Sequence, residues 1–258
     1  MSEHYDAHCH IDFANNAQEI AMKAKDRNVH ALCSTVIPSS FVSAEERFAD
    51  APCITVGLGI HPWWIDEARV SEVDVAHFDD LVRSAPFIGE VGLDFSRRRK
   101  GSHARQVEIF QHLMKSTREH APGRPLFIHA VRSCEEVIDI LDEYGMFESN
   151  ICVFHWFSGT REQFGRALSK GALFSVSMRM IAQGDGAFIT SALPSDHLLA
   201  ETDSPPHEGS PWSVDTWIQE IENTMQAIAE ARSEELETVR QTLKANYQTL
   251  LSAMPAHR

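Results

Sequence analysis

The chain has 258 residues, of which 43% are hydrophobic and 23% charged, and this composition predicts one globular domain over residues 1–258 with a full core. Its 23 basic and 37 acidic residues give a net charge of −14, which argues against a surface that grips nucleic acid through basic charge alone. A phosphate-bearing substrate would therefore need a local source of positive charge, such as bound metal ions.

The cysteines and the start of the chain indicate a cytoplasmic protein. The five cysteines are odd in number and show no Cys-x-x-Cys spacing, so neither a disulfide framework nor a thiolate zinc site is expected. The opening stretch MSEHYDAHCH carries no basic region followed by an apolar run, and no stretch has the length needed to span a bilayer. We expect no membrane partner and see no sign of an obligate protein partner.

Short apolar runs alternate with segments of helical spacing along the whole chain. The expected strands lie near YDAH, HALCSTV, CITVGLGI, PFIGEVGL, PLFIHA, NICVFHW, ALFSVS and LLAETD. The expected helices span residues 17–27, 41–49, 74–83, 104–120, 135–144, 161–170, 187–193, 214–231 and 234–252. This alternation predicts an α/β fold of the (β/α)8 TIM-barrel type. The alternative is a doubly wound open sheet, which lacks support because no Gly-x-Gly-x-x-Gly turn follows the first strand.

Ionisable residues recur at or near the carboxyl ends of the expected strands. They are His8, His10, His61, Glu90, His129, His155 and Asp203. A single histidine at a strand end is more often structural than a ligand, but a barrel assembles its active site at these strand ends. Imidazole and carboxylate are the ligands that zinc, manganese and similar ions take. The set therefore predicts a metal centre, with Glu90 as the carboxylate placed to bridge two ions.

Strand periodicity suggests supporting groups behind these ligands. Asp6 lies two residues before His8, and Glu201 lies two before Asp203, so both acids are expected one layer deeper on the inward face. They would either accept hydrogen bonds from ligand imidazoles or pair with an arginine or with backbone amides. Cys9 is expected to face the helices.

Six stretches, DAHCHID, GLGIHPW, IGEVGLDF, FIHAVR, FHWFSGT and ETDSP, together with KANYQTLL near the end, resemble the motifs of the TatD family of metal-dependent hydrolases. The motifs occur in the order that the family shows and cover nearly the whole chain. The resemblance implies an amidohydrolase-like barrel with two divalent metal ions, Mg²⁺, Mn²⁺ or Zn²⁺. It also implies phosphodiester hydrolysis by a metal-activated water, as in deoxyribonucleases that trim DNA from the 3′ end.

The resemblance also implies roles for individual residues. One ion would take His8, His10, Glu90 and Asp203, and the other would take Glu90, His129 and His155. His61 resembles the substrate-side histidine that contacts phosphate. Apart from the resemblance, the place of Arg132 just beyond His129 makes it a second expected phosphate contact, with a structural salt bridge as its alternative. Asp203, beside both metal and water, is the expected proton acceptor, and Glu90 is the second catalytic residue.

Some features leave alternatives open. The same dinuclear site suits an amidohydrolase or esterase that acts on a small molecule, for which an acidic surface needs no explanation. The basic run Arg97-Arg98-Arg99-Lys100 either contacts substrate phosphates or forms a solvated loop. The loop after ETDSP reads SPPHEGSPWSV and lacks the Arg-Asn pair that family members often carry there, which leaves its substrate contacts open.

Overall fold

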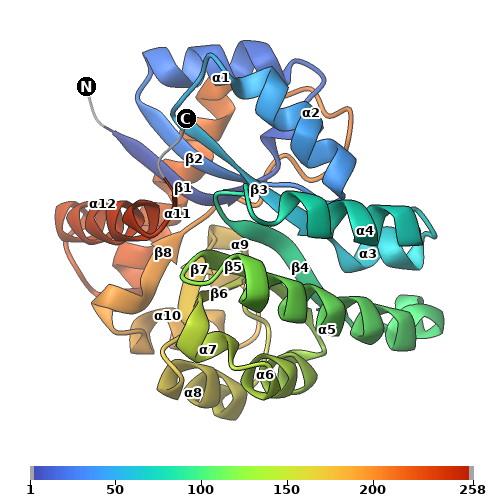
Figure 1. Cartoon of the computed structure of the whole chain (residues 1–258). Helices are drawn as coiled ribbons and strands as arrows, with labels where there is room; N and C mark the ends of the chain where they lie inside the picture. Colours follow the sequence, from blue (N-terminus) through green and yellow to red (C-terminus); the bar gives the residue numbers. More distant parts are fainter. Residues whose placement is uncertain (1–2, 256–258) are drawn as a thin grey trace.

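Eight parallel strands, paired in sequence order from β1 to β8, form the centre of the molecule. The computed structural model describes residues 3–255 (Figure 1). The strands are β1 His4–Cys9, β2 Val29–Ser34, β3 Ile54–Ile60, β4 Ile88–Asp94, β5 Pro125–Val131, β6 Ile151–His155, β7 Leu173–Val176 and β8 Leu198–Ala200. Helices surround this sheet in Figure 1, and the predicted (β/α)8 barrel is confirmed.

The helices follow the strands in alternation. They are α1 Ala17–Asp26, α2 Pro38–Phe48, α3 Pro62–Asp66, α4 Glu72–Leu81, α5 His103–His120, α6 Cys134–Glu143, α7 Met146–Ser149, α8 Arg161–Ser169, α9 Met178–Ile181, α10 Gly186–Ala192, α11 Val214–Arg232 and α12 Leu236–Ser252, with 3-10 turns η1 Ile11–Phe13, η2 Arg97–Ser102 and η3 Ser195–His197. The sequence did not predict α3, α7 and α9, because helices of four or five residues are too short to show a periodicity. Within residues 3–255, no helix is both long and apolar enough to cross a membrane.

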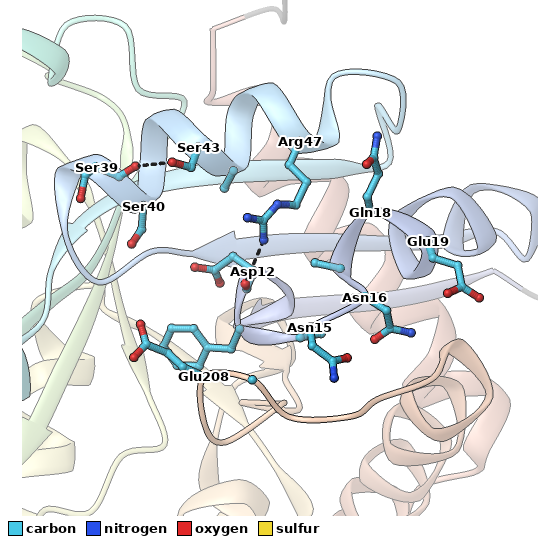
Figure 2. Close-up of a pocket in the computed structure, with 15 residues that line it drawn as sticks. Asp12, Asn15, Asn16, Gln18, Glu19, Ser39, Ser40, Ser43, Arg47 and Glu208 are labelled. Carbon is cyan, nitrogen blue, oxygen red and sulfur yellow. Dashed lines mark hydrogen bonds between the residues drawn. The ribbon is translucent and has the colours of Figure 1, made fainter.

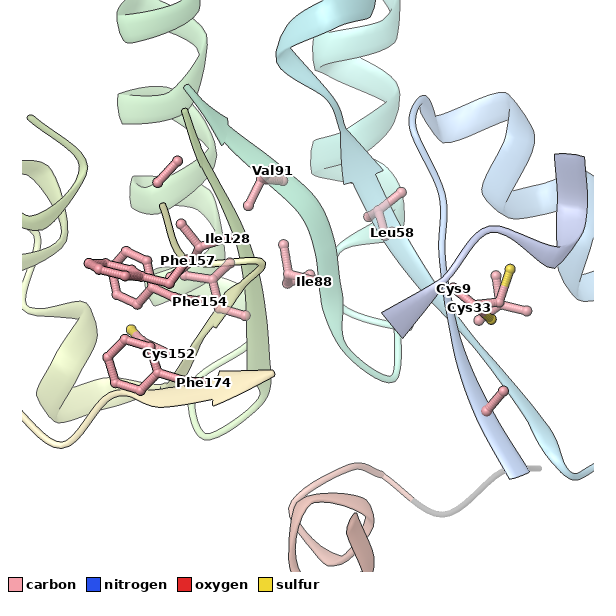
Figure 3. Close-up of a cluster of buried hydrophobic side chains, with 14 of the residues drawn as sticks. Cys9, Cys33, Leu58, Ile88, Val91, Ile128, Cys152, Phe154, Phe157 and Phe174 are labelled. Atoms are coloured by element: carbon pink, nitrogen blue, oxygen red, sulfur yellow. The ribbon is translucent and has the colours of Figure 1, made fainter. Parts of the chain in front are cut away.

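The larger part of the core lies between the strands and the helices. Figure 3 shows side chains of this layer, with Cys9 of β1 beside Cys33 of β2 and the aromatic rings of Phe154 and Phe174 on neighbouring strands. Cys9 is fully buried there and donates a hydrogen bond through Sγ to the carbonyl of Leu32, 3.6 Å away. Cys9 therefore faces the helices, as predicted.

A second apolar cluster fills the inside of the barrel. Leu32, Phe127 and Val153 belong to it, whereas their immediate chain neighbours belong to the outer layer, as the two-residue period of a strand requires. Tyr247 from α12 also packs into this cluster. Residues that lie between this inner apolar cluster and the carboxyl ends of the strands are the ones able to form a site.

The barrel has a seam between its last and first strands. Among the described residues no strand ladder joins β8 to β1, but two backbone hydrogen bonds cross just beyond β8. The amide of His10 donates to the carbonyl of Ser204, 2.9 Å away, and the amide of Asp203 donates to the carbonyl of His8, 3.0 Å away. The seam therefore holds Asp203 beside both histidines.

Asp6 strengthens this seam, and its predicted position on the inward face is wrong. The pairing of β1 with β2 shifts register between Asp6 and Cys9, so the simple alternation breaks between Asp6 and His8. The Asp6 carboxylate accepts hydrogen bonds from the Thr202 amide at 3.0 Å, the Thr202 hydroxyl at 2.6 Å, and Trp217 Nε1 of α11 at 2.7 Å. Asp6 accepts from the backbone amide of His8 at 3.2 Å and bonds no imidazole in the part of the chain that the structure describes.

Candidate metal centre

Glu90 lies at the middle of a buried group of histidines at the carboxyl ends of the strands. Its side chain is only 1% exposed, and its two carboxylate oxygens face different neighbours. We call the side chains around Oε2 the first donor group, and those around Oε1 the second donor group. The first consists of His8, His10 and Asp203, and the second of His61, His129 and His155.

An irregularity in β4 places Glu90 at this point. The pairing of β4 with both of its neighbours shifts register around Glu90, and the Glu90 amide instead donates to the carbonyl of Thr35, 2.9 Å away, beyond the end of β2. This approach requires Gly59 on β3, since a Cβ there would lie 2.1 Å from the Thr35 oxygen and 2.4 Å from the Glu90 nitrogen. The second glycine of GLGI, Gly59, thus makes room for the backbone of Glu90.

The first donor group has the spacing of ligands around one ion. Nε2 of His8 lies 3.4 Å from Glu90 Oε2 and 3.7 Å from Asp203 Oδ1. Nε2 of His10 lies 3.1 Å and 3.4 Å from the same two oxygens. Ligand atoms about 2.1 Å from a tetrahedral or octahedral ion lie roughly 3.0 to 3.4 Å from one another. The four atoms therefore surround a space suited to a single divalent cation.

Ser34, at the end of β2, orients both histidines of the first group. Its carbonyl oxygen accepts from Nδ1 of His10 at 2.8 Å, so the neutral ring presents an unprotonated Nε2. Its hydroxyl pairs with Nδ1 of His8 at 3.0 Å. The sequence analysis did not find Ser34, although its place at the carboxyl end of the strand next to β1 is a usable signal.

The nitrogens of the second donor group lie closer to Glu90 than those of the first group do. Glu90 Oε1 lies 2.7 Å from Nδ1 of His129, 2.7 Å from Nε2 of His155 and 3.0 Å from Nε2 of His61. The His129 and His155 nitrogens are 3.3 Å apart. These contacts are those of hydrogen bonds between an ionised carboxylate and imidazoles.

His61 differs from the other two histidines of this group. Its Nδ1 accepts a hydrogen bond from the backbone amide of Trp63, 3.1 Å away, so the neutral ring carries its proton on Nε2 and donates to Glu90. Burial lowers the pKa of His61 to about 4, despite the nearby Glu90 carboxylate, which keeps the ring neutral. A neutral ring that donates through Nε2 suits hydrogen bonding to an oxygen better than ligation of a metal.

The two carboxylates of the centre are both held ionised. Burial by itself would raise the pKa of Glu90, but the surrounding imidazoles hold that pKa well below its usual value. Burial also opposes ionisation of Asp203, and the neighbouring imidazoles of His10, His155 and His8 lower its pKa. The Asp203 side chain is 22% exposed, compared with 1% for Glu90, so Asp203 is the carboxylate within reach of solvent.

The residues present fit a divalent cation. Within residues 3–255, Nε2 of His8 and Oε2 of Glu90 are buried and lack a hydrogen-bond partner, an arrangement that is costly without a bound cation. Imidazole nitrogen and carboxylate oxygen are donors that zinc and manganese accept. His8, His10 and Asp203 also lie close enough together to hold one ion. His61, Glu90 and His129 are equally close, but the proton on Nε2 of His61 favours the hydrogen bond to Glu90.

Two further carboxylates stand behind the second donor group. Glu201 Oε1 lies 3.6 Å from Nδ1 of His155, accepts from the Trp156 amide at 3.0 Å, and its other oxygen accepts from the Ser175 hydroxyl. Glu201 therefore binds a backbone amide, one of the two arrangements considered from the sequence, and lies near His155 without a hydrogen bond to its ring. Asp94 was not singled out from the sequence, although it ends β4 within IGEVGLDF; its Oδ2 lies 3.9 Å from Nε2 of His129.

The basic residues near the barrel mouth have different surroundings. Arg132 is exposed and lines a cavity of about 550 Å³, and it makes no ion pair with any described residue. Arg99 pairs with Asp66 at 2.9 Å and lies over the Trp63 ring at 4.7 Å, so it has a structural role. Its neighbours Arg97, Arg98 and Lys100 are exposed.

Residues 5–252 match the family model described as TatD related DNase. Human "Deoxyribonuclease TATDN3" is 28% identical over 236 residues, covering 81% of this chain and 82% of that protein. The "3'-5' ssDNA/RNA exonuclease TatD" of Pantoea vagans is 26% identical over 203 residues, covering 75% of each chain. The Escherichia coli "Uncharacterized metal-dependent hydrolase YcfH" is 26% identical over 224 residues, covering 79% of this chain and 80% of that protein.

Solved structures agree on the fold. The crystal structure of YJJV, a TatD homologue from Escherichia coli, superimposes with a TM-score of 0.80 at 21% identity, covering 96% of this chain and 97% of that one. A TatD family hydrolase from Entamoeba histolytica gives 0.77 at 14% identity, covering 97% and 98%. The chain belongs to the TatD family, and the resemblance seen in the sequence motifs is confirmed.

Proposed function

We propose that this chain is a metal-dependent nuclease that hydrolyses phosphodiester bonds of single-stranded DNA. The observation that carries the proposal is the position of Glu90, whose two oxygens each face a separate group of buried donors. A carboxylate so placed suits two adjacent cations, an arrangement used in phosphodiester hydrolysis. The names of the human and Pantoea vagans relatives, a deoxyribonuclease and a 3′–5′ exonuclease, point to the same substrate class and to trimming from the 3′ end.

The proposed ligands follow the two donor groups. The first ion would be held by His8, His10, Asp203 and Glu90, and the second by His129, His155 and Glu90. Such ions, when bound, lower the pKa of a water and stabilise the charge that develops on phosphate oxygens. Glu90, which is almost fully buried, lies between the two groups and is common to both.

Asp203 and His61 have the remaining roles in this proposal. Asp203 is ionised and partly exposed, so its carboxylate can accept the proton of the attacking water. His61, kept neutral with its proton on Nε2, can donate a hydrogen bond to a phosphate oxygen without adding a charge. Arg132, exposed and without an ion pair among the described residues, supplies positive charge for a phosphate.

The test is cleavage of end-labelled single-stranded DNA by protein stripped with EDTA and then supplied with Mg²⁺, Mn²⁺ or Zn²⁺. Shortening from the 3′ end that returns with one of these ions, together with hydrolysis of bis(p-nitrophenyl) phosphate, is the expected result. A 5′-labelled and a 3′-labelled strand, run in parallel, establish the direction.

The same experiment separates this proposal from a small-molecule amidohydrolase or esterase. That alternative predicts stoichiometric metal binding, measured by titration calorimetry, with no cleavage of either phosphodiester. Such an outcome would overturn the nuclease proposal while keeping the metal centre.

A further inference from the structure

A polar groove lies beside the metal centre, with a volume of about 770 Å³. We call it the α2 groove, because one face of α2 forms a wall; the segment from Asp12 to Glu19 and residues 208–209 of the loop after β8 complete it. Figure 2 shows Ser39, Ser40 and Ser43 along α2, with Arg47 reaching from the same helix toward Asp12. Amide side chains of Asn15, Asn16 and Gln18 line the remaining wall.

One aromatic ring separates the α2 groove from the first donor group. The Phe13 ring lines the groove and stacks on the His10 ring, with centroids 4.9 Å apart and planes 13° from parallel. The backbone of Phe13 is fixed by the loop after β8, because its carbonyl accepts from the Gly209 amide at 2.7 Å. The groove therefore lies one ring away from His10, and a chain molecule whose reacting atom lies at the centre would have to pass Phe13 to enter it.

Arg47 is the basic residue that lines the α2 groove. Arg47 is exposed, donates to the main-chain oxygen of Asp12 at 3.2 Å, and pairs with no carboxylate among residues 3–255. Three acids line the groove. Glu208 accepts two hydrogen bonds from Arg69, both 3.1 Å, and Glu19 pairs with Lys23 at 2.5 Å. The third, Asp12, accepts from Cys33 Sγ at 3.5 Å, and its carboxylate forms no ion pair with Arg47.

The neutral groups are suited to hydrogen bonding with a nucleotide. Asn16 donates through Nδ2 to the carbonyl of Trp212 at 3.3 Å, whereas its Oδ1 is buried without a hydrogen-bond partner in the described chain. Ser40 in the same groove can donate to a ligand, and the Asn16 oxygen becomes available to accept from an amino or hydroxyl group once its side chain turns toward the groove. A buried acceptor and an unpaired guanidinium together match a phosphate with its attached nucleoside.

We propose that the α2 groove binds the nucleotide that flanks the scissile bond, with its phosphate on Arg47. The inference rests on the proposed nuclease function and assigns the path that the substrate strand takes away from the metal centre. The strand would leave the first donor group past Phe13 and run along α2. Positive charge is scarce on a chain of net charge −14, so this one contact should account for a measurable share of strand affinity.

The test compares Arg47→Gln with Arg47→Lys and with the control Arg83→Gln. Arg83 is also exposed and follows α4, at the opposite end of the barrel strands. We expect Arg47→Gln to raise KM for single-stranded DNA about tenfold, as loss of one charge-assisted phosphate contact does. Arg47→Lys should recover most of this loss, and Arg83→Gln should leave KM unchanged.

Two further readouts distinguish a phosphate contact from a general disturbance. The slope of log KM against log salt should fall by about 0.7 in Arg47→Gln, the value for one contact to a single strand. Hydrolysis of bis(p-nitrophenyl) phosphate, which has no flanking nucleotide, should stay at the wild-type rate. Wild-type KM and salt slope for DNA in Arg47→Gln would overturn the groove proposal and leave the nuclease function intact. Failure of the wild-type protein to cleave any phosphodiester would overturn both.

Discussion

The two donor groups around Glu90 share one carboxylate but differ in spacing and in access to solvent. The histidine nitrogens of the first group lie 3.1 to 3.7 Å from Glu90 Oε2 and Asp203 Oδ1, whereas Glu90 Oε1 lies only 2.7 Å from His129 and from His155 in the second. The first group includes Asp203, which is 22% exposed, and the histidines of the second are nearly buried.

This difference indicates an order of binding. The first group already has the spacing of ligands about one ion, so an ion enters with little movement. In the second group, hydrogen bonds must open by several tenths of an ångström before an ion fits. We therefore expect the first group to bind its ion more tightly, which a calorimetric titration with Mn²⁺ would show as two steps.

The largest effect is expected from Glu90→Ala, which removes the group that both sites share. Activity on DNA should fall more than about a thousandfold, and both binding steps should weaken in the titration. Circular dichroism should show the folded barrel. Wild-type activity in this variant would exclude the bridging role.

Asp203→Asn should separate the two groups. It leaves the second group intact, so one binding step should remain while the tighter one weakens. Loss of the proton acceptor should lower kcat by about 10² to 10⁴, measured at saturating Mn²⁺ so that ion occupancy does not limit the rate. Equal weakening of both steps would contradict the assignment of Asp203 to the first group.

Ser34→Ala should act only through the orientation of His8. The variant keeps the backbone carbonyl that orients His10 but loses the hydroxyl, and we expect the first step to weaken about tenfold. Ser175→Ala is the matched control, because the Ser175 hydroxyl supports Glu201 behind the second group. If both serine variants changed the same step, the two groups would not be independent.

Cys9→Ser should have the smallest effect. Cys9 lies between His8 and His10 but faces the apolar outer layer, and a hydroxyl can keep the bond to Leu32. Stability should fall by about 1 kcal/mol, measured by urea unfolding, and both binding steps and kcat should match the wild type. A changed metal affinity would mean that the two faces of β1 are coupled.

Most of the candidate-site residues that the sequence predicted lie at the ends of strands. His8, His10, Glu90, His129, His155 and Asp203 were chosen because parallel strands of a barrel deliver their last residues to one rim, and the structure brings these side chains together. Their roles as ligands stay predictions, as does the single domain over residues 1–258.

Other features depend on local backbone geometry that periodicity does not encode. The register shift in β1 lies between Asp6 and Cys9, so Asp6 and His8 do not share a face. Ser34 orients the histidines through its main-chain carbonyl as well as its hydroxyl. Every residue type has a main-chain carbonyl, so the sequence does not indicate this contribution. Arg99, in a basic run, proved to be paired with Asp66, a partner that is distant in sequence.

The seam beside Asp6 has a consequence for how the barrel comes apart. β8 has only three residues, and the segment just beyond it is joined to β1 and His10 by two backbone bonds and by the Asp6 carboxylate, which also holds α11 through Trp217. Breaking this small set of bonds would turn the closed cylinder into an open sheet while the other ladders stay intact. Amide hydrogen exchange should therefore be fastest, among the strands, along β8. The same opening would move Asp203 away from His8 and His10, so a bound first ion should slow exchange at the seam before it slows exchange elsewhere.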